Sequence, residues 1–80
     1  MKVTLKLGRF GMQMEDGLIE RWHAPVGAQV QPGDVLYELE TDKISQQVES
    51  EFAGIVEEVF VRAGDTVPVG APLCVIKVTK

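Results

Sequence analysis

Hydrophobic and polar residues alternate with a period of two along much of the chain. Residues 3–7 and 35–40 show this alternation, and residues 73–76 form a short run of residue types favoured in strands. Such alternation predicts strands with one buried face. Four turn-forming triplets separate these segments: Pro25-Val26-Gly27, Pro32-Gly33-Asp34, Ala63-Gly64-Asp65 and Pro68-Val69-Gly70. Short strands with frequent turns indicate an all-β sandwich or barrel without a normal helix.

An internal repeat relates the two parts of the chain. Residues 17–40 align with residues 54–77 at an offset of 37, with six identities in 24 positions. Chance can give six identities, but glycines and apolar positions recur together, which favours two similar β halves. Such halves are expected to pack as facing sheets with pseudo-two-fold symmetry. If the turn at Gly54 needs a positive φ angle, Gly54→Val should destabilise the fold.

The length, charge and cysteine content of the chain exclude several classes of function. The chain has 80 residues and a net charge of −4, which argues against a nucleic-acid partner. A single cysteine excludes an internal disulfide framework and a cysteine-based zinc site. No apolar stretch is long enough for a membrane-spanning helix, and the first residues resemble neither a signal nor a transit peptide. So small a domain has little room for a walled active site, so we expect no catalytic residues and no metal.

One lysine lies between the two halves. The segment Glu40-Thr41-Asp42-Lys43-Ile44-Ser45 follows a predicted strand and precedes a polar stretch. Because aspartate favours turns by bonding its own backbone, we expect Asp42 to set a tight hairpin with Lys43 at its tip. Taken alone, such a lysine is usually a solvated charge.

The sequence resembles the lipoyl domain of the dihydrolipoamide acyltransferase component of 2-oxo-acid dehydrogenase complexes, in the biotinyl/lipoyl attachment family. Glu-Thr-Asp-Lys at 40–43 matches the family's lipoylation motif. Further matches are Gly8, Met14-Glu15-Asp16-Gly17, Trp22, Gly33-Asp34-Val35-Leu36, Gly54, Gly64-Asp65 and Pro68-Val69-Gly70. The resemblance extends from about Val3 to Val78. Ile44, Gln47 and Ala28 depart from the commonest pattern, which bears on partner preference rather than on modification.

The resemblance implies a flattened, barrel-like sandwich of two four-stranded antiparallel sheets, with the lysine hairpin and the termini at opposite ends. It implies that residues 1–80 form one non-catalytic carrier domain, the N-terminal domain of a larger acyltransferase. Lipoic acid would be attached to Lys43 by an amide bond. As a swinging arm it would carry acyl groups and reducing equivalents between the 2-oxo-acid decarboxylase, the acyltransferase catalytic domain and dihydrolipoyl dehydrogenase.

The resemblance also points to recognition residues. A lipoate ligase or lipoyl transferase would read the placement of Lys43, to which Glu40, Thr41, Asp42 and Ile44 contribute. The Gly8–Asp16 loop is expected beside the hairpin and would help the decarboxylase choose its carrier. The residues of this loop singled out for recognition are Arg9, Phe10, Met12, Gln13 and Met14. Equally, Phe10, Met12 and Met14 could fold back onto the sandwich.

Two other function classes are open. A biotin carrier of a carboxylase has the same fold, but its lysine usually lies between two methionines, whereas Lys43 lies between Asp42 and Ile44. An unmodified β interaction module would leave Lys43 an ordinary surface lysine. His23 has no recognisable companions for catalysis or metal binding, and Cys74 is expected to be a buried small hydrophobe. An initial Met1 without a transit peptide favours a bacterial cytoplasmic protein, with the mitochondrial matrix expected for a eukaryotic one. The sequence names neither the oxo acid nor the oligomeric state.

Overall fold

A computed structural model describes residues 1–79, which form eight β-strands. The strands are β1 (Lys2–Lys6), β2 (Asp16–Trp22), β3 (Gln29–Val30), β4 (Val35–Glu40), β5 (Ser45–Glu49), β6 (Gly54–Val59), β7 (Thr66–Pro68) and β8 (Pro72–Val78). Within this range no helix is long and apolar enough to cross a membrane. The prediction of an all-β fold is confirmed.

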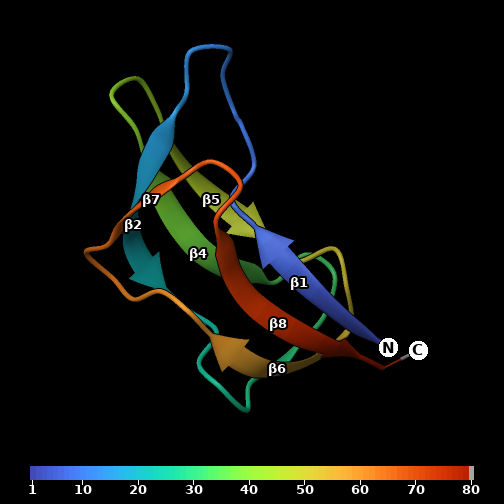
Figure 1. Cartoon of the computed structure of the whole chain (residues 1–80). Helices are drawn as coiled ribbons and strands as arrows, with labels where there is room; N and C mark the ends of the chain where they lie inside the picture. The colour runs from blue at the N-terminus through green and yellow to red at the C-terminus, as the bar shows by residue number, and fades with distance from the viewer. Residues whose placement is uncertain (80) are drawn as a thin grey trace.

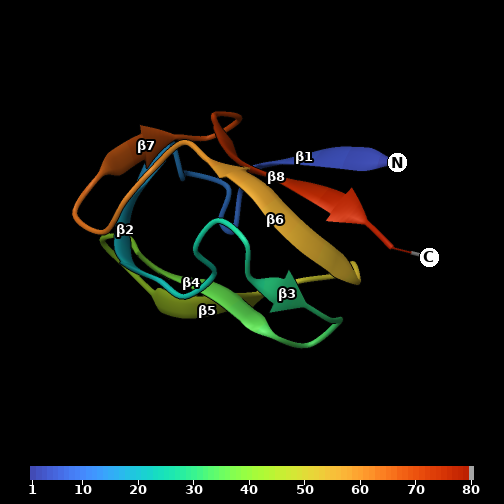
Figure 2. The ribbon, with the colours of Figure 1, turned by 90° about the horizontal axis from the view of Figure 1, so that it is seen from below.

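The strands form two four-stranded antiparallel sheets. One has the order β1-β8-β6-β3 and the other β5-β4-β2-β7. Figure 1 shows the sheets facing one another, and Figure 2 shows β6 and β8 in one layer with β4 and β5 in the other. Each sheet therefore combines strands from both halves of the chain, which ties the halves together.

The backbone hydrogen bonds confirm the predicted pseudo-two-fold symmetry. The Ile19 amide donates to the Asp65 carbonyl (2.8 Å), and the Val56 amide donates to the Ala28 carbonyl (2.9 Å). Ile19 and Val56, and likewise Ala28 and Asp65, are 37 positions apart. The register of the sheets shifts between Ile19 and Arg21 and between Val56 and Glu58, again at this offset. The repeat thus extends to the irregularities of the strands.

Four turn glycines follow the same offset. Gly27 and Gly64 have φ angles of 94° and 99°, and Gly33 and Gly70 have φ angles of 95° and 93°. Side-chain-bearing residues rarely adopt this left-handed region. The glycines that revealed the repeat in the sequence are therefore required by equivalent turns.

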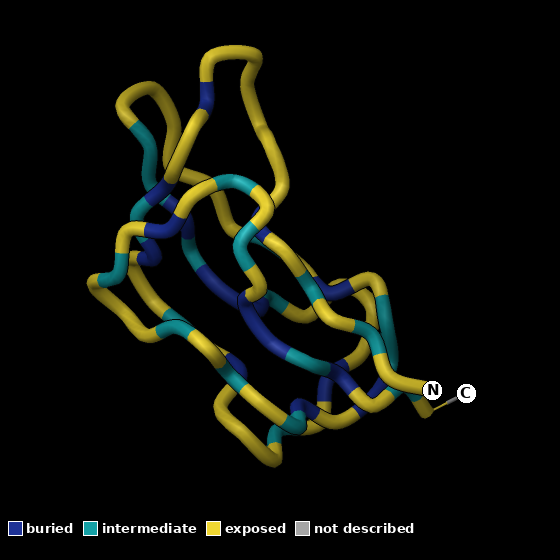
Figure 3. The backbone as a smooth tube through the Cα atoms, in the orientation of Figure 1, coloured by how far each residue is buried: buried dark blue, intermediate teal, exposed yellow. Residues whose placement is uncertain are grey.

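The core lies between the inner faces of the sheets, whereas the loops are largely exposed (Figure 3). Its most completely buried side chains are Leu7, Ile19, Leu36, Leu39, Val56, Leu73, Cys74 and Ile76. Trp22 stacks on Tyr37 with ring centroids 5.3 Å apart. Burial raises the pKa of the Cys74 thiol to about 11 and that of Tyr37 to about 12, where the nearby Cys74 adds to the effect. The prediction that Cys74 is a buried small hydrophobe is confirmed.

Gly54 is needed for a different reason from the one expected. Its φ angle is not positive, because it lies within strand β6. A Cβ atom there would clash with the backbone carbonyl of Lys77 on β8. At the equivalent Gly17, a Cβ atom would instead meet the end of the Leu39 side chain. Close approach of two strands, rather than turn conformation, excludes a side chain at Gly54.

Candidate cofactor-attachment site

Lys43 lies at the tip of the hairpin that joins β4 to β5, and its side chain is exposed. The pairing of β4 with β5 continues to Glu40 and Ser45. Beyond this pair the Thr41 amide donates to the Ile44 carbonyl at 2.8 Å, which closes the turn. The predicted tight hairpin is confirmed, and the strand pairing from Tyr37 to Glu40 supports the turn that holds the lysine.

Thr41, rather than Asp42, makes the side-chain hydrogen bonds of this turn. The Thr41 hydroxyl accepts from the amides of Ile44 (3.2 Å) and Lys43 (3.4 Å). The carboxylate of Asp42 has no hydrogen bond to any residue in the range 1–79, so the expectation that it sets the turn was wrong. A threonine at the first turn position also caps the backbone, and this signal was present in the sequence.

The other described lysines lie on the opposite sheet. Lys2 and Lys6 belong to β1 and Lys77 to β8, and the Lys2 ammonium pairs with Glu57 at 3.0 Å. Figure 1 shows the Lys43 hairpin and the chain termini at opposite ends of the molecule, whose longest extent is 35 Å. A partner that approaches the hairpin end therefore meets Lys43 and none of these three lysines.

A long loop flanks the hairpin, as expected from the family. The loop between β1 and β2 rises beside the Lys43 hairpin at the same end of the molecule (Figure 1). It is braced internally, because the Met14 amide donates to the Gly11 carbonyl (3.1 Å) and the Phe10 amide to the Met14 sulfur (3.2 Å). An open groove of about 690 Å³ lies between the loop and the hairpin. It is lined by residues 10–18, residues 40–44 and Thr66.

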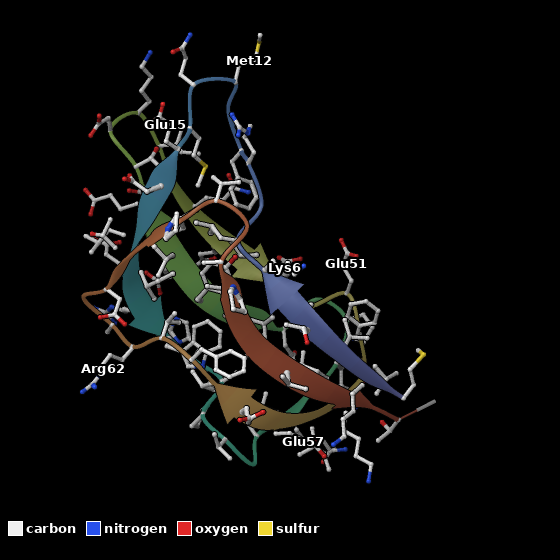
Figure 4. All side chains as sticks on the ribbon, in the orientation of Figure 1. Lys6, Met12, Glu15, Glu51, Glu57 and Arg62 are labelled. Atoms are coloured by element: carbon white, nitrogen blue, oxygen red, sulfur yellow. The ribbon has the colours of Figure 1, made fainter. Side chains whose placement is uncertain are left out.

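The structure separates the five candidate recognition residues of the loop. Met14 is 8 % exposed and belongs to the core, so it supports the loop and is not available for direct contact with a partner. Met12 is 91 % exposed at the loop tip, where Figure 4 shows it pointing away from the body. Phe10 is 36 % exposed, while Arg9 and Gln13 are exposed. Folding back onto the sandwich is therefore confirmed for Met14 and wrong for Met12.

Sequence reasoning missed Glu20 as a neighbour of the motif. Repulsion by Glu40 on the adjacent strand, followed by desolvation, raises the pKa of Glu20. The two residues come together because β2 pairs with β4 and Leu18, two residues before Glu20, is the partner of Glu40. Only the strand pairing reveals this acidic pair, since nineteen residues separate its members.

His23 directly follows β2 and bonds to a carboxylate of β4. One of its ring nitrogens, Nε2, is 2.7 Å from Glu38 Oε2. Among residues 1–79 no group of three or more histidine, cysteine or acidic side chains is arranged to hold a metal ion. His23 is therefore an exposed residue paired with the neighbouring strand.

Comparison with known proteins places the chain in a family. The family model described as "Biotin-requiring enzyme" matches residues 3–76. The acetyltransferase component of the acetoin cleaving system of Pseudomonas putida is 36 % identical, with 91 % of this chain and 20 % of that protein covered. The succinyltransferase component of the 2-oxoglutarate dehydrogenase complex of Staphylococcus saprophyticus is 38 % identical, with 90 % and 17 % covered. The chain thus spans about a fifth of the length of these relatives.

Solved structures agree with this placement. The lipoyl domain of the 2-oxoglutarate dehydrogenase complex from Azotobacter vinelandii has a TM-score of 0.75 and 31 % identity, and covers 98 % of this chain and 96 % of that one. A single-chain, multi-domain long-chain acyl-CoA carboxylase has a TM-score of 0.80 and 28 % identity, with 98 % of this chain and 7 % of that one covered. The sandwich, the motif hairpin and the family match agree: the chain belongs to the biotinyl/lipoyl attachment family, as a lipoyl-type carrier domain without catalysis of its own.

Proposed function

We propose that Lys43 carries lipoic acid in amide linkage and that the domain presents this arm to successive enzymes of a 2-oxo-acid or acetoin dehydrogenase complex. One observation carries the proposal: Lys43 stands on the exposed turn of a well-paired hairpin at the end of the molecule away from Met1 and Val78. A covalent arm at that place is open to large partners while the body stays outside their active sites.

The residues around Lys43 fit the attached group. The side chain of Lys43 is exposed and forms no ion pair with any residue between Met1 and Thr79, so its amine is open to acylation. When attached, lipoate supplies a dithiolane that accepts an acyl group and carries two reducing equivalents. About a dozen bonds separate the Lys43 Cα from the ring, a reach of roughly 15 Å. Thr41 holds the turn from which this arm would extend.

Catalysis then belongs to the partners. A lipoate ligase or lipoyl transferase would recognise the turn formed by Glu40, Thr41, Asp42 and Ile44. A 2-oxo-acid decarboxylase, an acyltransferase catalytic domain and dihydrolipoyl dehydrogenase would use the arm in turn. The exposed loop residues Arg9, Phe10, Met12 and Gln13 lie at the same end and would help the decarboxylase recognise its carrier.

The relatives support a proposal for the parent protein and its compartment. Both acyltransferase relatives are several times longer than this chain, which supports a longer acyltransferase parent. We propose that the present residues form its N-terminal domain. The relatives named above are bacterial, which supports a cytoplasmic location, with the mitochondrial matrix expected for a eukaryotic source. Their complexes differ, so they support the carrier role more than any one oxo acid.

The flanking residues favour lipoate over biotin. Lys43 lies between Asp42 and Ile44, whereas the lysine of biotin carriers usually lies between two methionines. The likeness to an acyl-CoA carboxylase nevertheless makes biotin the main competing cofactor.

Intact-mass measurement tests the proposal. The protein is incubated with a lipoate ligase, ATP and lipoic acid, and the product is mapped by peptide mass spectrometry. We expect one lipoyl increment on Lys43, none in Lys43→Arg, and normal modification of Lys77→Arg, whose lysine lies in β8. Modification by biotin ligase alone would assign the domain to a carboxylase. Failure with both ligases would leave an unmodified β interaction module.

A further inference from the structure

We propose that the groove between the β1–β2 loop and the Lys43 hairpin holds the domain's own lipoyl arm when no partner is bound. The inference rests on the proposed function, because it requires an arm on Lys43. It adds a binding site for that arm on this chain. Attachment of lipoate to an exposed lysine does not by itself require such a site.

The attachment point lies at the edge of the groove. Lys43 is one of the residues that line the groove, so a group joined to its Nζ starts at the groove wall. The volume of about 690 Å³ lies within the range of about 300–1,000 Å³ typical of small-molecule sites. A short flexible tether gives the arm an effective concentration on the order of millimolar at the groove. Even weak affinity then populates the bound position.

Part of the groove lining is apolar. Met12, Phe10 and Ile44 line it, and they are three of the seven large hydrophobic side chains exposed within residues 1–79. Exposed apolar side chains gathered at one place mark an interaction site more often than scattered ones do. A methionine at 91 % exposure is flexible and polarisable, which suits contact with a sulfur-containing ring. Phe10 and Ile44 would contact the carbon chain of the arm. Met12, which points outward at the rim, would turn toward the groove to cover the dithiolane.

The charged residues of the groove are mostly acidic. The carboxylates of Glu15, Asp16, Glu40 and Asp42 line the groove, and Lys43 is the one cation among its described lining residues. Formation of the amide at Lys43 removes that cation. The rim therefore repels a free carboxylate such as lipoate but accepts an attached arm, which is uncharged. The groove is thus suited to the arm after attachment rather than to the free cofactor.

The β1–β2 loop is longer than its counterpart in the other half of the molecule. Leu7 and Ser50 make equivalent backbone bonds, to Ala71 and Gly70 in one half and to Asp34 and Gly33 in the other. Nine residues separate Leu7 from Gly17, whereas three separate Ser50 from Gly54. The six additional residues stand beside Lys43 and supply Phe10 and Met12. The loop that builds the groove is an addition to the symmetric sandwich.

The test compares the lipoylated protein with two variants. Phe10→Gln/Met12→Gln removes apolar lining from the groove, and Met12→Gln alone changes a side chain too exposed to affect folding. Phe60→Gln is the matched control, because Phe60 is 49 % exposed and does not line the groove. For each protein, intact mass establishes the lipoyl increment and urea unfolding establishes the fold. Amide NMR spectra before and after attachment, and the rate of dithiolane reduction by a water-soluble phosphine, report on the arm.

We expect attachment to shift the amide signals of Gly11 and Met12 in the wild-type protein. Phosphine should reduce the wild-type dithiolane roughly threefold more slowly than that of the double variant, with Met12→Gln in between and Phe60→Gln like the wild type. A lipoyl increment on Lys43 with unshifted loop amides and equal reduction rates would overturn the inference and leave the carrier function intact. Absence of the increment would overturn both.

Discussion

Residues 17–40 and 54–77 follow the same backbone path but fill it with different side chains. Their turns, register shifts and connecting hydrogen bonds repeat at an offset of 37. Yet the stacked pair Trp22 and Tyr37 in one half corresponds to Val59 and Cys74 in the other, where the same strand pairing brings them together. Two aromatic rings in one half thus correspond to two smaller side chains in the other half. The fold requires the same backbone geometry in both halves, whereas only the total volume of the core side chains is constrained.

The two halves also differ outside the sandwich, and there the difference bears on function. The β1–β2 loop contains six more residues than its counterpart after Ser50. The hairpin that holds Lys43 has its symmetric counterpart at the termini, where the Val78 amide donates to the Met1 carbonyl. The longer loop and the Lys43 hairpin lie at the same end of the molecule. Four predictions test this comparison.

The largest expected effect contrasts Gly54→Ala with Gly17→Ala. A methyl group at Gly54 meets the Lys77 backbone, which cannot rotate away, so the free energy of unfolding should fall by about 3 kcal/mol or more. At Gly17 it meets the Leu39 side chain, and the loss should be nearer about 1 kcal/mol. Urea unfolding followed by Trp22 fluorescence measures both. Equal losses would show that the strands on either side of the core approach equally closely.

The second prediction concerns the equivalent residues Tyr37 and Cys74 at alkaline pH. The folded protein holds the Cys74 thiol protonated to about pH 11, whereas the unfolded chain ionises it near 9.0. Its contribution to stability is therefore complete below pH 9 and is lost as the pH rises to 11, by up to about 2–3 kcal/mol. Tyr37 should act in the same direction between pH 10 and 12. Across this range the urea midpoint of unfolding should fall more steeply with pH for the wild type than for Cys74→Ala. Equal slopes of the midpoint against pH would contradict the prediction.

Third, Gly27→Ala and Gly64→Ala should cost nearly the same. Both glycines have φ angles above 90°, and an added Cβ meets no atom within 4 Å, so only backbone strain is introduced. We expect each variant to lose about 1 kcal/mol of unfolding free energy, with the two values within about 0.5 kcal/mol of one another. Thermal and urea unfolding of the pair measure the difference. A gap above 1 kcal/mol would mean that the symmetry of the turns does not extend to their energetics.

The smallest effect on stability is expected at Thr41, in the hairpin that breaks the symmetry. Its side-chain hydrogen bonds are 3.2–3.4 Å long and solvent-exposed, so Thr41→Ala should reduce the unfolding free energy by less than about 1 kcal/mol. Because these bonds hold the Lys43 amide, the initial rate of modification by lipoate ligase should fall several-fold. Thr41→Ser keeps the hydroxyl and serves as the control, with intact mass at short times as the measurement. An Asp42→Ala variant that is slower than Thr41→Ala would restore Asp42 as the main determinant of the turn.

The sequence contains the strand pattern, the repeat and the position of Lys43, because period-two alternation and turn glycines are local signals. Strands β3 and β7 have two and three residues, too few to show alternation. The burial of Met14 depends on how a long loop folds back, and the Glu20–Glu40 pair depends on the pairing of β2 with β4. The reason for Gly54 lies in the distance between two strands, which no local pattern reports. Features that depend on contacts between residues distant in the sequence could therefore be identified only from the structure.

The elongated shape of the sandwich has a mechanical consequence. Met1 and Val78 lie together at one end of a 35 Å body and Lys43 at the other. If the domain is tethered through a terminus, the paired strands form a rigid body between the tether and the lysine. A small rotation of the domain about the tether then moves the Lys43 end over a long distance without any change inside the domain. Under the proposed function, rotation of the whole domain accounts for most of the movement between enzymes, and the arm on Lys43 needs only to reach into the active site.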